Sequence, residues 1–221
     1  MNKIGVIIVA GGSGSRMKSD TPKQFIEING KPILQYTLDR FFNWNPNIDL
    51  VLVLPKNGID TWKDIINKNG YSLNYRICAG GTERFDSVKN GLGHLENDLI
   101  MIHDGVRPFV SDATLNRCLV AVKKSGTAIP VVPVVESMRK ITTDGSQPVD
   151  RNSLKIVQTP QCFKNDWIKK AYQQSFSADF TDDASVAQKA GYPIILIDGN
   201  RENIKITTVD NLKSAEFYTG K

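Results

Sequence analysis

The stretch Ile7–Phe25 reads IIVAGGSGSRMKSDTPKQF, and it decides the fold because an apolar run ends there in closely spaced glycines. The run Lys3–Ala10 is continuous and rich in β-branched residues, which is typical of a strand buried on both faces. Glycines directly after a strand let backbone N–H groups approach a phosphate closely. The stretch therefore predicts an α/β protein whose first strand ends at a phosphate-binding loop.

The remainder of the 221 residues repeats this alternation of apolar strands and helical patterns. Strands are expected at Leu50–Leu54, Tyr75–Ala79, Leu99–His103, Thr127–Val135, Ile194–Ile197 and Ile204–Thr207. Helices are expected at Pro32–Trp44, around Trp62–Ile66, at Glu83–Leu95, from Ser111 or Asp112, at Asp166–Gln174 and Asp182–Lys189, and from Asp210. The pattern predicts a single α/β domain, residues 1–221, with a mostly parallel sheet and helices on both faces.

The alternation breaks between Ser137 and Pro160. Here Met138–Thr142 and Leu154–Gln158 flank the turn-rich segment TDGSQPVDRN, which is longer than a two-residue hairpin loop. We interpret residues 137–160 as a protruding β-arm. Because an isolated hairpin is only marginally stable in water, the arm predicts a homodimer in which it packs on another subunit. The alternative is a hairpin that folds back on its own sheet.

Charge and composition narrow the classes of protein. The net charge of +5 is spread along the chain and not clustered, so nucleic-acid binding is not expected. The N-terminal apolar run is too short for a signal peptide or a membrane span, and we expect a soluble protein of the cytoplasm without membrane association. The three cysteines lie far apart and form no C-x-x-C pair, so the sequence supports neither a zinc site nor disulfides.

Two common nucleotide-binding loops do not fit the glycine-rich stretch. The dinucleotide fingerprint requires a third glycine where this chain has Met17, and an acidic residue after the second strand, which ends at Leu54-Pro55. The P-loop requires a Gly-Lys-Ser/Thr ending that the stretch lacks. A serine hydrolase is not indicated either, since no G-x-S-x-G motif accompanies His94 or His103.

What remains is a glycine loop with two nearby cations. Arg16 offers a planar fork that bridges phosphate oxygens, and Lys23 offers a mobile point charge after the stiff Thr21-Pro22. The α-phosphorus of a triphosphate is attacked only when the charge on the surrounding oxygens is neutralised. The two cations therefore favour chemistry on a triphosphate. The alternative for Lys23 is a solvated surface lysine.

Glycine and charge recur at the ends of three predicted strands, in the segments AGGSGSR, AGGTERFDS and HDGVRP. In open α/β sheets, ligands bind beyond the carboxyl ends of the strands. Three such ends predict one shared site.

The motif G-G-x-G-x-R-M followed by P-K-Q-F resembles the nucleotidyltransferases that make sugar and polyol nucleotides, and most closely the 2-C-methyl-D-erythritol 4-phosphate cytidylyltransferase family. Further similar segments, in order, are AGGTERFDSV, HDGVRPFV, VDRN, QTPQ, FTDDAS and NIKIT. The resemblance implies a Rossmann-like sheet of the nucleotide-diphospho-sugar transferase type. It also implies a reaction of CTP with methylerythritol phosphate to a CDP-alcohol and pyrophosphate, with Mg²⁺ as the cofactor.

The resemblance implies roles for the nucleotide half of the site. Arg16 and Lys23 would stabilise the charge on the α-phosphate as the bond to pyrophosphate lengthens. The base, ribose and phosphates of CTP would be lined by Ala10, Gly11, Gly12, Ser13 and Gly14. The cytosine ring would be recognised by Gly80, Gly81 and Ser87. The alternative for the glycine pair is a plain turn between a strand and a helix.

Asp104 ends a predicted strand in HDG, where a carboxylate can hold Mg²⁺ against the triphosphate, directly or through water. The alternative for Asp104 is a turn or cap residue. Gly105 is expected beside the nucleotide. Where the family commonly reads HDAARP this chain reads HDGVRP, which affects the walls beside Asp104 and not the type of reaction.

The acceptor half is expected to carry extra cations, because the nucleophile is the substrate's own phosphate and no protein nucleophile is required. By resemblance these cations are Lys205, in NIKIT, and Arg151, on the β-arm. The alternative for both is solvent exposure. If the arm crosses to a partner, Arg151 completes the neighbour's site.

Other polar residues are expected near the polyol phosphate by the same resemblance. Arg107 would contact it or orient the neighbouring aspartate, and Ser137 and Thr159 would line its pocket. Ser137 replaces a threonine that is more usual in the family, and both side chains keep a hydroxyl. Asp182 and Asp183 are interpreted as the start of a helix, with no catalytic role.

Two other functions stay open from the sequence. Ribitol 5-phosphate cytidylyltransferases share the fold, CTP and the reaction, but VDRN, VQTPQ and TDDAS favour the methylerythritol family. A non-catalytic nucleotide-binding regulator on the same fold is the second alternative. The presence of both Arg16 and Lys23 argues against a regulator.

Overall fold

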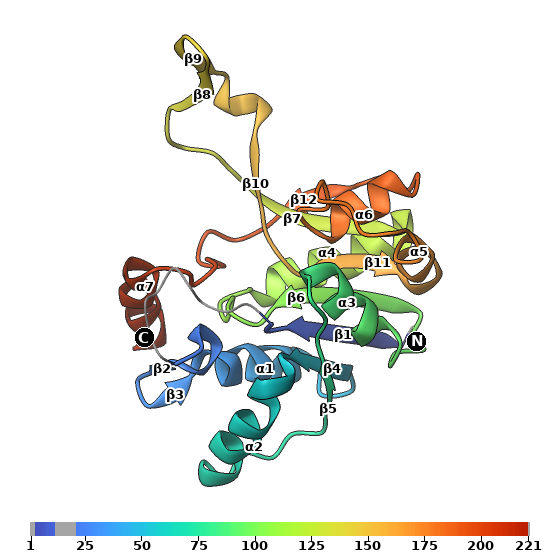
Figure 1. The fold of residues 1–221 in the computed structure, drawn as a ribbon, viewed down its shortest axis with the longest axis vertical. Coiled ribbons are helices and arrows are strands. Elements are labelled where there is room, and N and C mark those ends of the chain that lie inside the picture. The colour runs from blue at the N-terminus through green and yellow to red at the C-terminus, as the bar shows by residue number, and fades with distance from the viewer. Residues whose placement is uncertain (1–2, 12–20, 221) are drawn as a thin grey trace.

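The computed structural model describes residues 3–11 and 21–220, which are built around one mixed sheet (Figure 1). Within these residues the main sheet has eight strands. Across the sheet they follow the order β10 (Lys155–Val157), β7 (Thr127–Pro133), β11 (Gln161–Lys164), β6 (Leu99–Asp104), β1 (Ile4–Val9), β4 (Asp49–Leu54) and β5 (Arg76–Ala79), with β12 (Leu196–Asp198) also paired to β7.

The expected mostly parallel sheet is confirmed, with one antiparallel insertion. Strand β1 pairs in parallel with β4 and β6, β4 with β5, and β12 with β7. Strands β10 and β11 run antiparallel to β7, and β11 also runs antiparallel to β6. Strand β11 was not predicted, because it is short and begins within the irregular segment QTPQ, at Gln161, without an apolar run.

The described residues form seven α-helices, of which the first six pack on the sheet and the last packs on a separate small core (Figure 1). They are α1 (Ile33–Trp44), α2 (Ile59–Lys68), α3 (Arg84–Leu92), α4 (Asp112–Ser125), α5 (Asn165–Ala171), α6 (Asp183–Lys189) and α7 (Val209–Thr219). Of the two expected caps for α4, Ser111 is the one that accepts a bond from the Thr114 N–H. No helix in the described ranges is long and apolar enough to cross a membrane.

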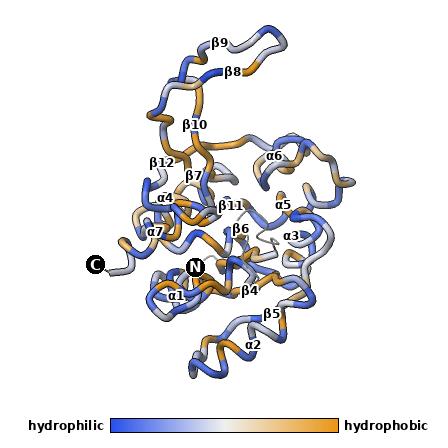
Figure 2. Tube along the Cα trace, turned by 60° about the vertical axis from the view of Figure 1, so that its left-hand side comes forward, coloured by the Kyte–Doolittle hydropathy of each residue, from blue (hydrophilic) through white to orange (hydrophobic). Residues whose placement is uncertain are grey.

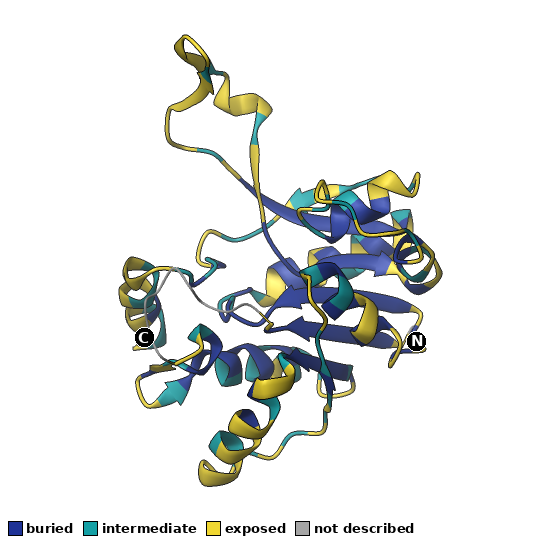
Figure 3. Ribbon diagram, in the orientation of Figure 1, coloured by how far each residue is buried: buried dark blue, intermediate teal, exposed yellow. Residues whose placement is uncertain are grey.

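The two faces of the sheet bury separate cores, as the alternation along β1 requires. Ile4, Val6 and Ile8 pack with buried residues of α1, α2 and α4. Ile7 and Val9 point the other way and pack with α3, α5 and α6. Figure 2 shows the hydrophobic residues gathered along the central strands, and Figure 3 shows these strands as buried. The two cores hold the strand ends in fixed positions.

The segment Ile204–Thr207 is not a strand, so that prediction was wrong. It runs as irregular backbone past the loop after β6, and the Ile206 N–H donates to the Val106 carbonyl at 3.0 Å. Ile206 is buried in a third small core with Ala215 of α7 and Ile28 of the short strand β2 (Glu27–Ile28), which pairs with β3 (Lys31–Pro32). The alternating apolar pattern therefore arises because one side of the segment is buried, although the segment does not pair with a strand.

The segment 137–160 contains a hairpin, but the strands pair differently from the expectation. Strand β8 (Met138–Thr142) pairs with β9 (Gly145–Val149) through a two-residue loop, and not with Leu154–Gln158. Gly145 has φ of 126°, a conformation that favours glycine. Strand β10 pairs instead with β7 of the main sheet. The hairpin β8–β9 projects from the body of the molecule (Figure 1), and its residues are mostly exposed (Figure 3).

Candidate active site

A cleft of about 360 Å³ lies beyond the carboxyl ends of β1, β5 and β6. Its walls come from Ala10 and Gly11 after β1, from Gly81 after β5, and from Asp104 at the end of β6. Strands β1, β4 and β5 are parallel neighbours, and β6 lies on the other side of β1. Because parallel strands end at the same edge, three segments far apart in the chain meet in one site.

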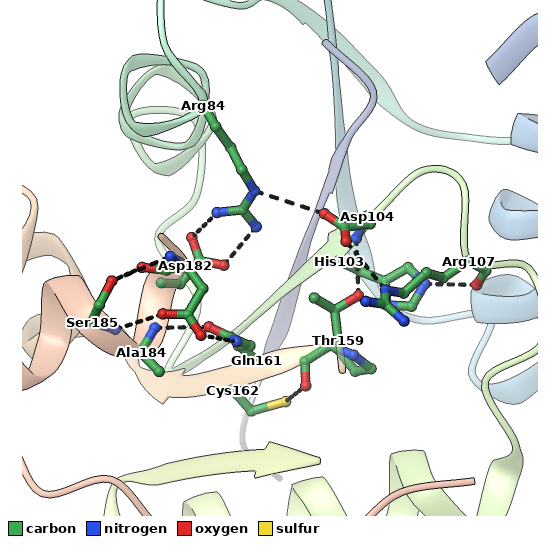
Figure 4. Close-up of polar contacts among 12 residues, drawn as sticks. Arg84, His103, Asp104, Arg107, Thr159, Gln161, Cys162, Asp182, Ala184 and Ser185 are labelled. Atoms are coloured by element: carbon green, nitrogen blue, oxygen red, sulfur yellow. Dashed lines mark hydrogen bonds and ion pairs between the residues drawn. The ribbon is translucent and has the colours of Figure 1, made fainter. Parts of the chain in front are cut away.

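Asp104 is buried at this edge and lies among three cations, of which Figure 4 shows Arg84 and Arg107. Its Oδ2 lies 3.0 Å from Lys205 Nζ and 3.2 Å from Arg107 Nε, and its Oδ1 lies 3.7 Å from Arg84 Nε. Burial alone would raise the pKa of this carboxyl, but Arg84, Lys205 and Arg107 together hold it well below its usual range. Asp104 is therefore ionised at any physiological pH.

Thr159 and His103 hold the carboxyl end of β6 in position through hydrogen bonds. The Thr159 hydroxyl accepts a bond from the Asp104 N–H at 3.1 Å and contacts His103 Nδ1 at 3.0 Å. His103 Nε2 lies 2.9 Å from the Arg107 carbonyl, which can only accept, so Nε2 carries the proton and Nδ1 accepts from Thr159. Burial lowers the pKa of His103 to about 4, which keeps the ring neutral. Thr159 lines the site as expected, but its hydroxyl serves this network.

The residues around Asp104 fit a Mg²⁺ ion that is held by a single protein carboxylate. Mg²⁺ usually binds through one or two carboxylates and completes its shell with substrate phosphates and water. Asp104 Oδ1 lies 3.7 Å from Arg84 Nε, beyond hydrogen-bond distance, and Asp104 lines both hollows, from which a metal would approach it. No group of three or more potential metal ligands occurs among residues 3–11 and 21–220. A metal here would therefore depend on the phosphates.

Gly81 and Ser87 form the wall of the cleft on the side of β5. The Ser87 hydroxyl accepts from the Gly81 N–H and donates to the Glu83 carbonyl, both at 3.1 Å. A Cβ on Gly81 would lie 2.2 Å from the Cβ of Asp86, and one on Gly80 would lie 2.7 Å from Ser87 Oγ. The glycine pair is thus required by the close approach of α3. The close packing fits the alternative of a plain turn between a strand and a helix. The glycines also give this wall of the cleft no side chains, so a base can approach it.

The remaining residues predicted for the nucleotide half fall into three groups. Lys23 begins a short 3₁₀ helix and lines the cleft. Gly105 packs beneath the cleft instead, since a Cβ there would lie 2.9 Å from the Cβ of Ala10. The predicted residues that lie outside the described ranges are Gly12, Ser13, Gly14 and Arg16.

A second hollow of about 270 Å³ adjoins the first and contains most of the residues predicted for the acceptor. Arg107 and Thr159 line it, and it shares Arg84, Asp104 and Lys205 with the first cleft. The Asp104 cluster, which consists of Asp104, Arg84, Arg107 and Lys205, therefore lies at the junction of the two hollows. This is the position at which two substrates would have to meet.

Two predicted acceptor residues are not brought to Asp104 within the single chain. Ser137 and Arg151 are exposed on the segment that carries the arm and line neither hollow. Arg151 Nη1 donates to the Val135 carbonyl at 2.5 Å. Any contact of these residues with a substrate requires a second subunit or a movement of the arm.

Arg84, which lines both hollows, and Asp183, which binds it, were not predicted as site residues. Arg84 lies in the quoted segment AGGTERFDSV, where it received no role, and Asp183 was interpreted only as the start of a helix. The two side chains form a two-pronged ion pair with distances of 2.8 and 2.7 Å. The helix interpretation holds for Asp182, whose side chain accepts from the Ser185 N–H at 2.8 Å and caps α6. The added role of Asp183 depends on a contact across 99 residues of sequence.

The mostly parallel sheet, the glycine segments at three strand ends and the cation-rich carboxylate define this chain as a nucleotidyltransferase of the Rossmann-like type. The family model of 2-C-methyl-D-erythritol 4-phosphate cytidylyltransferase matches residues 4–221. The chain belongs to this family.

Individual relatives and solved structures agree with the family match. A 2-C-methyl-D-erythritol 4-phosphate cytidylyltransferase of Bacteroides fragilis is 48% identical over 210 residues, which are 95% of this chain and 96% of that protein. One from Porphyromonas gingivalis is 44% identical over 96% of this chain and 95% of that protein. The structure of 4-diphosphocytidyl-2C-methyl-D-erythritol synthase from Anaerococcus prevotii superposes with a TM-score of 0.83 at 30% identity, covering 100% of this chain and 97% of that one.

Proposed function

We propose that this protein transfers CMP from CTP to 2-C-methyl-D-erythritol 4-phosphate and releases pyrophosphate, a step in isoprenoid precursor synthesis. The observation that carries the proposal is Asp104 with Lys205, Arg107 and Arg84 at the junction of two hollows. One hollow has the glycine walls and Lys23 that suit a nucleotide. The other has the cations that suit a phosphorylated acceptor. The naming of the relatives supports the choice of both substrates.

In this mechanism a phosphate oxygen of the acceptor attacks the α-phosphorus of CTP, and the bond to pyrophosphate breaks. No side chain forms a covalent intermediate. Lys205 and Arg107 hold the acceptor phosphate against its repulsion from the triphosphate, because their charge is concentrated beside Asp104. Lys23, together with Arg16, stabilises the charge that grows on the α-phosphate in the transition state.

We further propose Mg²⁺ as the cofactor, held by Asp104 Oδ1 and completed by phosphate and water. When bound, it would neutralise charge on the triphosphate. The support is the chemistry of this oxygen, which lies beyond hydrogen-bond distance from Arg84.

We also propose a homodimer in which the arm contributes Arg151 to the neighbour's site. Large apolar side chains are exposed along the arm and at its base. Exposed apolar side chains that cluster in this way are typical of a surface that contacts another protein. They are Val135, Met138, Ile141, Ile156 and Val157. The exposure of Arg151 away from its own Asp104 cluster also supports an inter-subunit role.

An assay of pyrophosphate release with purified protein, CTP and Mg²⁺ tests the proposal. We expect turnover with 2-C-methyl-D-erythritol 4-phosphate to exceed turnover with ribitol 5-phosphate. Faster turnover with ribitol 5-phosphate would reassign the acceptor. Tight binding of CTP without pyrophosphate release for any acceptor would favour the regulatory alternative.

The role of Lys23 has its own test. Lys23→Ala should lower kcat far more than the affinity for CTP, because the proposed stabilisation grows in the transition state. Lys56→Ala is the matched control, since Lys56 also follows a proline and begins a 3₁₀ helix, but it is exposed and lines neither hollow. Equal losses of CTP affinity and kcat in Lys23→Ala would contradict the role.

A further inference from the structure

Arg84 occupies the boundary between the two hollows and lines both of them. It stands on the first turn of α3, directly after the glycine wall of the nucleotide half. Its Nε lies 3.7 Å from Asp104 Oδ1. A dashed line joins the two side chains in Figure 4. Both Nη atoms face away from Asp104 and bind Asp183 at 2.8 and 2.7 Å. The guanidinium therefore connects the first turn of α6 to the carboxylate at the centre of the site.

Asp183 is fully buried and is held from two sides. Besides the two bonds from Arg84, its Oδ1 accepts from the Tyr172 hydroxyl at 2.6 Å. Burial raises the pKa of Tyr172 well above its usual value, and the charge of Asp183 raises it further, so the phenol remains a donor. A buried carboxylate with these donors keeps its charge and its orientation.

This arrangement determines what Arg84 can bind. An arginine beside two phosphorylated substrates would ordinarily clamp a phosphate with its fork. Here Asp183 occupies the fork and balances its charge. Burial alone would lower the pKa of Arg84, but Asp183 and Asp104 raise it above its usual value, so the side chain keeps that charge. Only Nε is directed at the reacting region, towards Asp104.

We propose that Asp183, supported by Tyr172, is a positioning residue that fixes Arg84 between the nucleotide and acceptor halves of the site. Arg84 then keeps its positive charge beside Asp104, with Nε 3.7 Å from Oδ1, and its own fork is kept away from the substrates' phosphates. The acceptor phosphate is left to Lys205 and Arg107. This inference deepens the proposed transferase function and rests on it for its kinetic consequences, but its structural claim about Arg84 can be measured separately.

The kinetic test is a double-mutant cycle of Asp183→Asn and Arg84→Gln. Asp183→Asn should lower kcat by about 10-fold or more, while KM for the acceptor does not rise, because the freed fork of Arg84 binds phosphate unproductively. In the Arg84→Gln background, Asp183→Asn should change kcat by less than about 2-fold, because Asp183 acts through Arg84. Equal reductions of kcat in both backgrounds would overturn the proposal.

A matched pair of tyrosine variants separates positioning from simple stability. Tyr172→Phe removes the hydroxyl bound to Asp183 at 2.6 Å, and Tyr71→Phe removes one bound to Asp39 at 2.7 Å, away from both hollows. Each variant loses one bond from a phenol to a carboxylate. Tyr172→Phe should lower kcat and Tyr71→Phe should not, at similar losses of thermal stability. Equal effects on kcat would mean that the bonds from Tyr172 and Arg84 to Asp183 serve only the stability of the fold, and this would contradict the proposal.

A measurement on the free protein decides the structural claim without turnover. In ¹⁵N spectra the Arg84 Nη–H protons, which bind Asp183 at 2.8 and 2.7 Å, should exchange slowly with water in the wild type and much faster in Asp183→Asn. Unchanged exchange in Asp183→Asn would overturn the inference. Inactivity of the wild type with every acceptor would instead contradict the proposed function, and the exchange result would still decide whether Asp183 fixes Arg84.

Discussion

Asp104 draws three cationic side chains together, and the balance of charge around it explains how two anionic substrates can meet. Four cations, Lys23, Arg84, Arg107 and Lys205, line the two hollows together with three carboxylates, Glu83, Asp104 and Asp182. Three of the cations gather within 3.7 Å of Asp104, so positive charge is concentrated at the junction of the hollows. Cations grouped in a concave site attract anions. Asp104 would also supply the carboxylate for the proposed Mg²⁺.

Removal of Lys205 should affect the acceptor more than the nucleotide. Lys205→Met should lower kcat/KM for the acceptor by about 10- to 100-fold, because it deletes a charge beside the proposed phosphate position. KM for CTP should change by less than about 3-fold. Steady-state kinetics with each substrate varied in turn check this.

Lys213→Met is the control for that variant, since Lys213 is largely exposed on α7 and pairs only weakly, at 4.0 Å, with Asp210. It should leave both KM values unchanged. If Lys205→Met changes the two KM values to the same degree, Lys205 is not specific to the acceptor.

His103 should make the stability of the fold depend on pH in a defined window. Its pKa falls from 6.5 in the unfolded chain to about 4 in the folded one, mainly through burial. Above pH 6.5 both states are neutral and the stabilisation is complete. Between pH 6.5 and 4 only the unfolded chain binds the proton, so the free energy of unfolding falls by about 3 kcal/mol in total, and it levels off below the folded pKa.

Denaturant unfolding at several pH values measures this dependence. His103→Gln should have lower stability at pH 7 but should lack the extra loss between pH 6.5 and 4, whereas the exposed His94→Gln should retain it. Asp104 does not interfere, because its pKa is lowered from 3.8 and its contribution is lost only at more acidic pH. A similar loss of stability between pH 6.5 and 4 in the wild type and both variants would mean that groups other than His103 cause the pH dependence.

Individual site residues could be predicted where the local segment carries the signal. Asp104, Arg107 and Lys205 stand in short motifs at strand ends or after them, and the structure brings them together. Arg84 and Asp183 could not be paired in this way. Their contact spans 99 residues and arises only because α3 and α6 cover the same face of the sheet.

Elements were predictable where burial is complete and continuous. The strands β1, β4 and β6 are almost entirely buried, and their apolar runs mark them within one or two residues. Strand β11 is flanked by polar residues and is held by its two neighbours rather than by its own pattern. The hairpin β2–β3 had a usable signal that was overlooked, since Asn29-Gly30 adopts positive φ values of 51° and 75° between the two strands.

The junction of β5 and α3 shows how tightly one element sets a wall of the site. Gly81→Ala would place a Cβ 2.2 Å from the Cβ of Asp86, so the glycine wall has to move away from α3. We expect a loss of about 1–3 kcal/mol in the free energy of unfolding. We also expect weaker binding of CTP, because the wall that it faces is displaced. Chemical denaturation and CTP titration measure the two effects.

Gly220→Ala is the control for overpacking, because a Cβ there meets nothing closer than the Glu216 carbonyl at 3.5 Å. It should change neither stability nor affinity by a measurable amount. Normal CTP binding in a destabilised Gly81→Ala protein would show that this wall does not contact the nucleotide.

The molecule as a whole separates a compact sheet, which carries the Asp104 cluster, from a projecting hairpin, which carries apolar side chains to solvent (Figure 1). Ile141 near the tip is 80% exposed. If the arm packs on a partner, Ile141→Glu should shift the protein from dimer to monomer in sedimentation. Val120→Glu on α4 should not, although Val120 is 68% exposed. A monomeric wild type would contradict the dimer.

The contribution of Arg151 across the dimer can be tested by complementation. Arg151→Ala and Lys205→Ala should each be nearly inactive alone. In a mixed dimer, the chain with Arg151→Ala keeps its own Lys205 and receives Arg151 from its partner, so one of the two sites is intact. Random association makes half of the dimers mixed, and co-expression should therefore restore about a quarter of the wild-type activity. If Arg151 acts within its own chain, every site still lacks either Arg151 or Lys205 in all the dimers, and activity should stay at the level of the single variants.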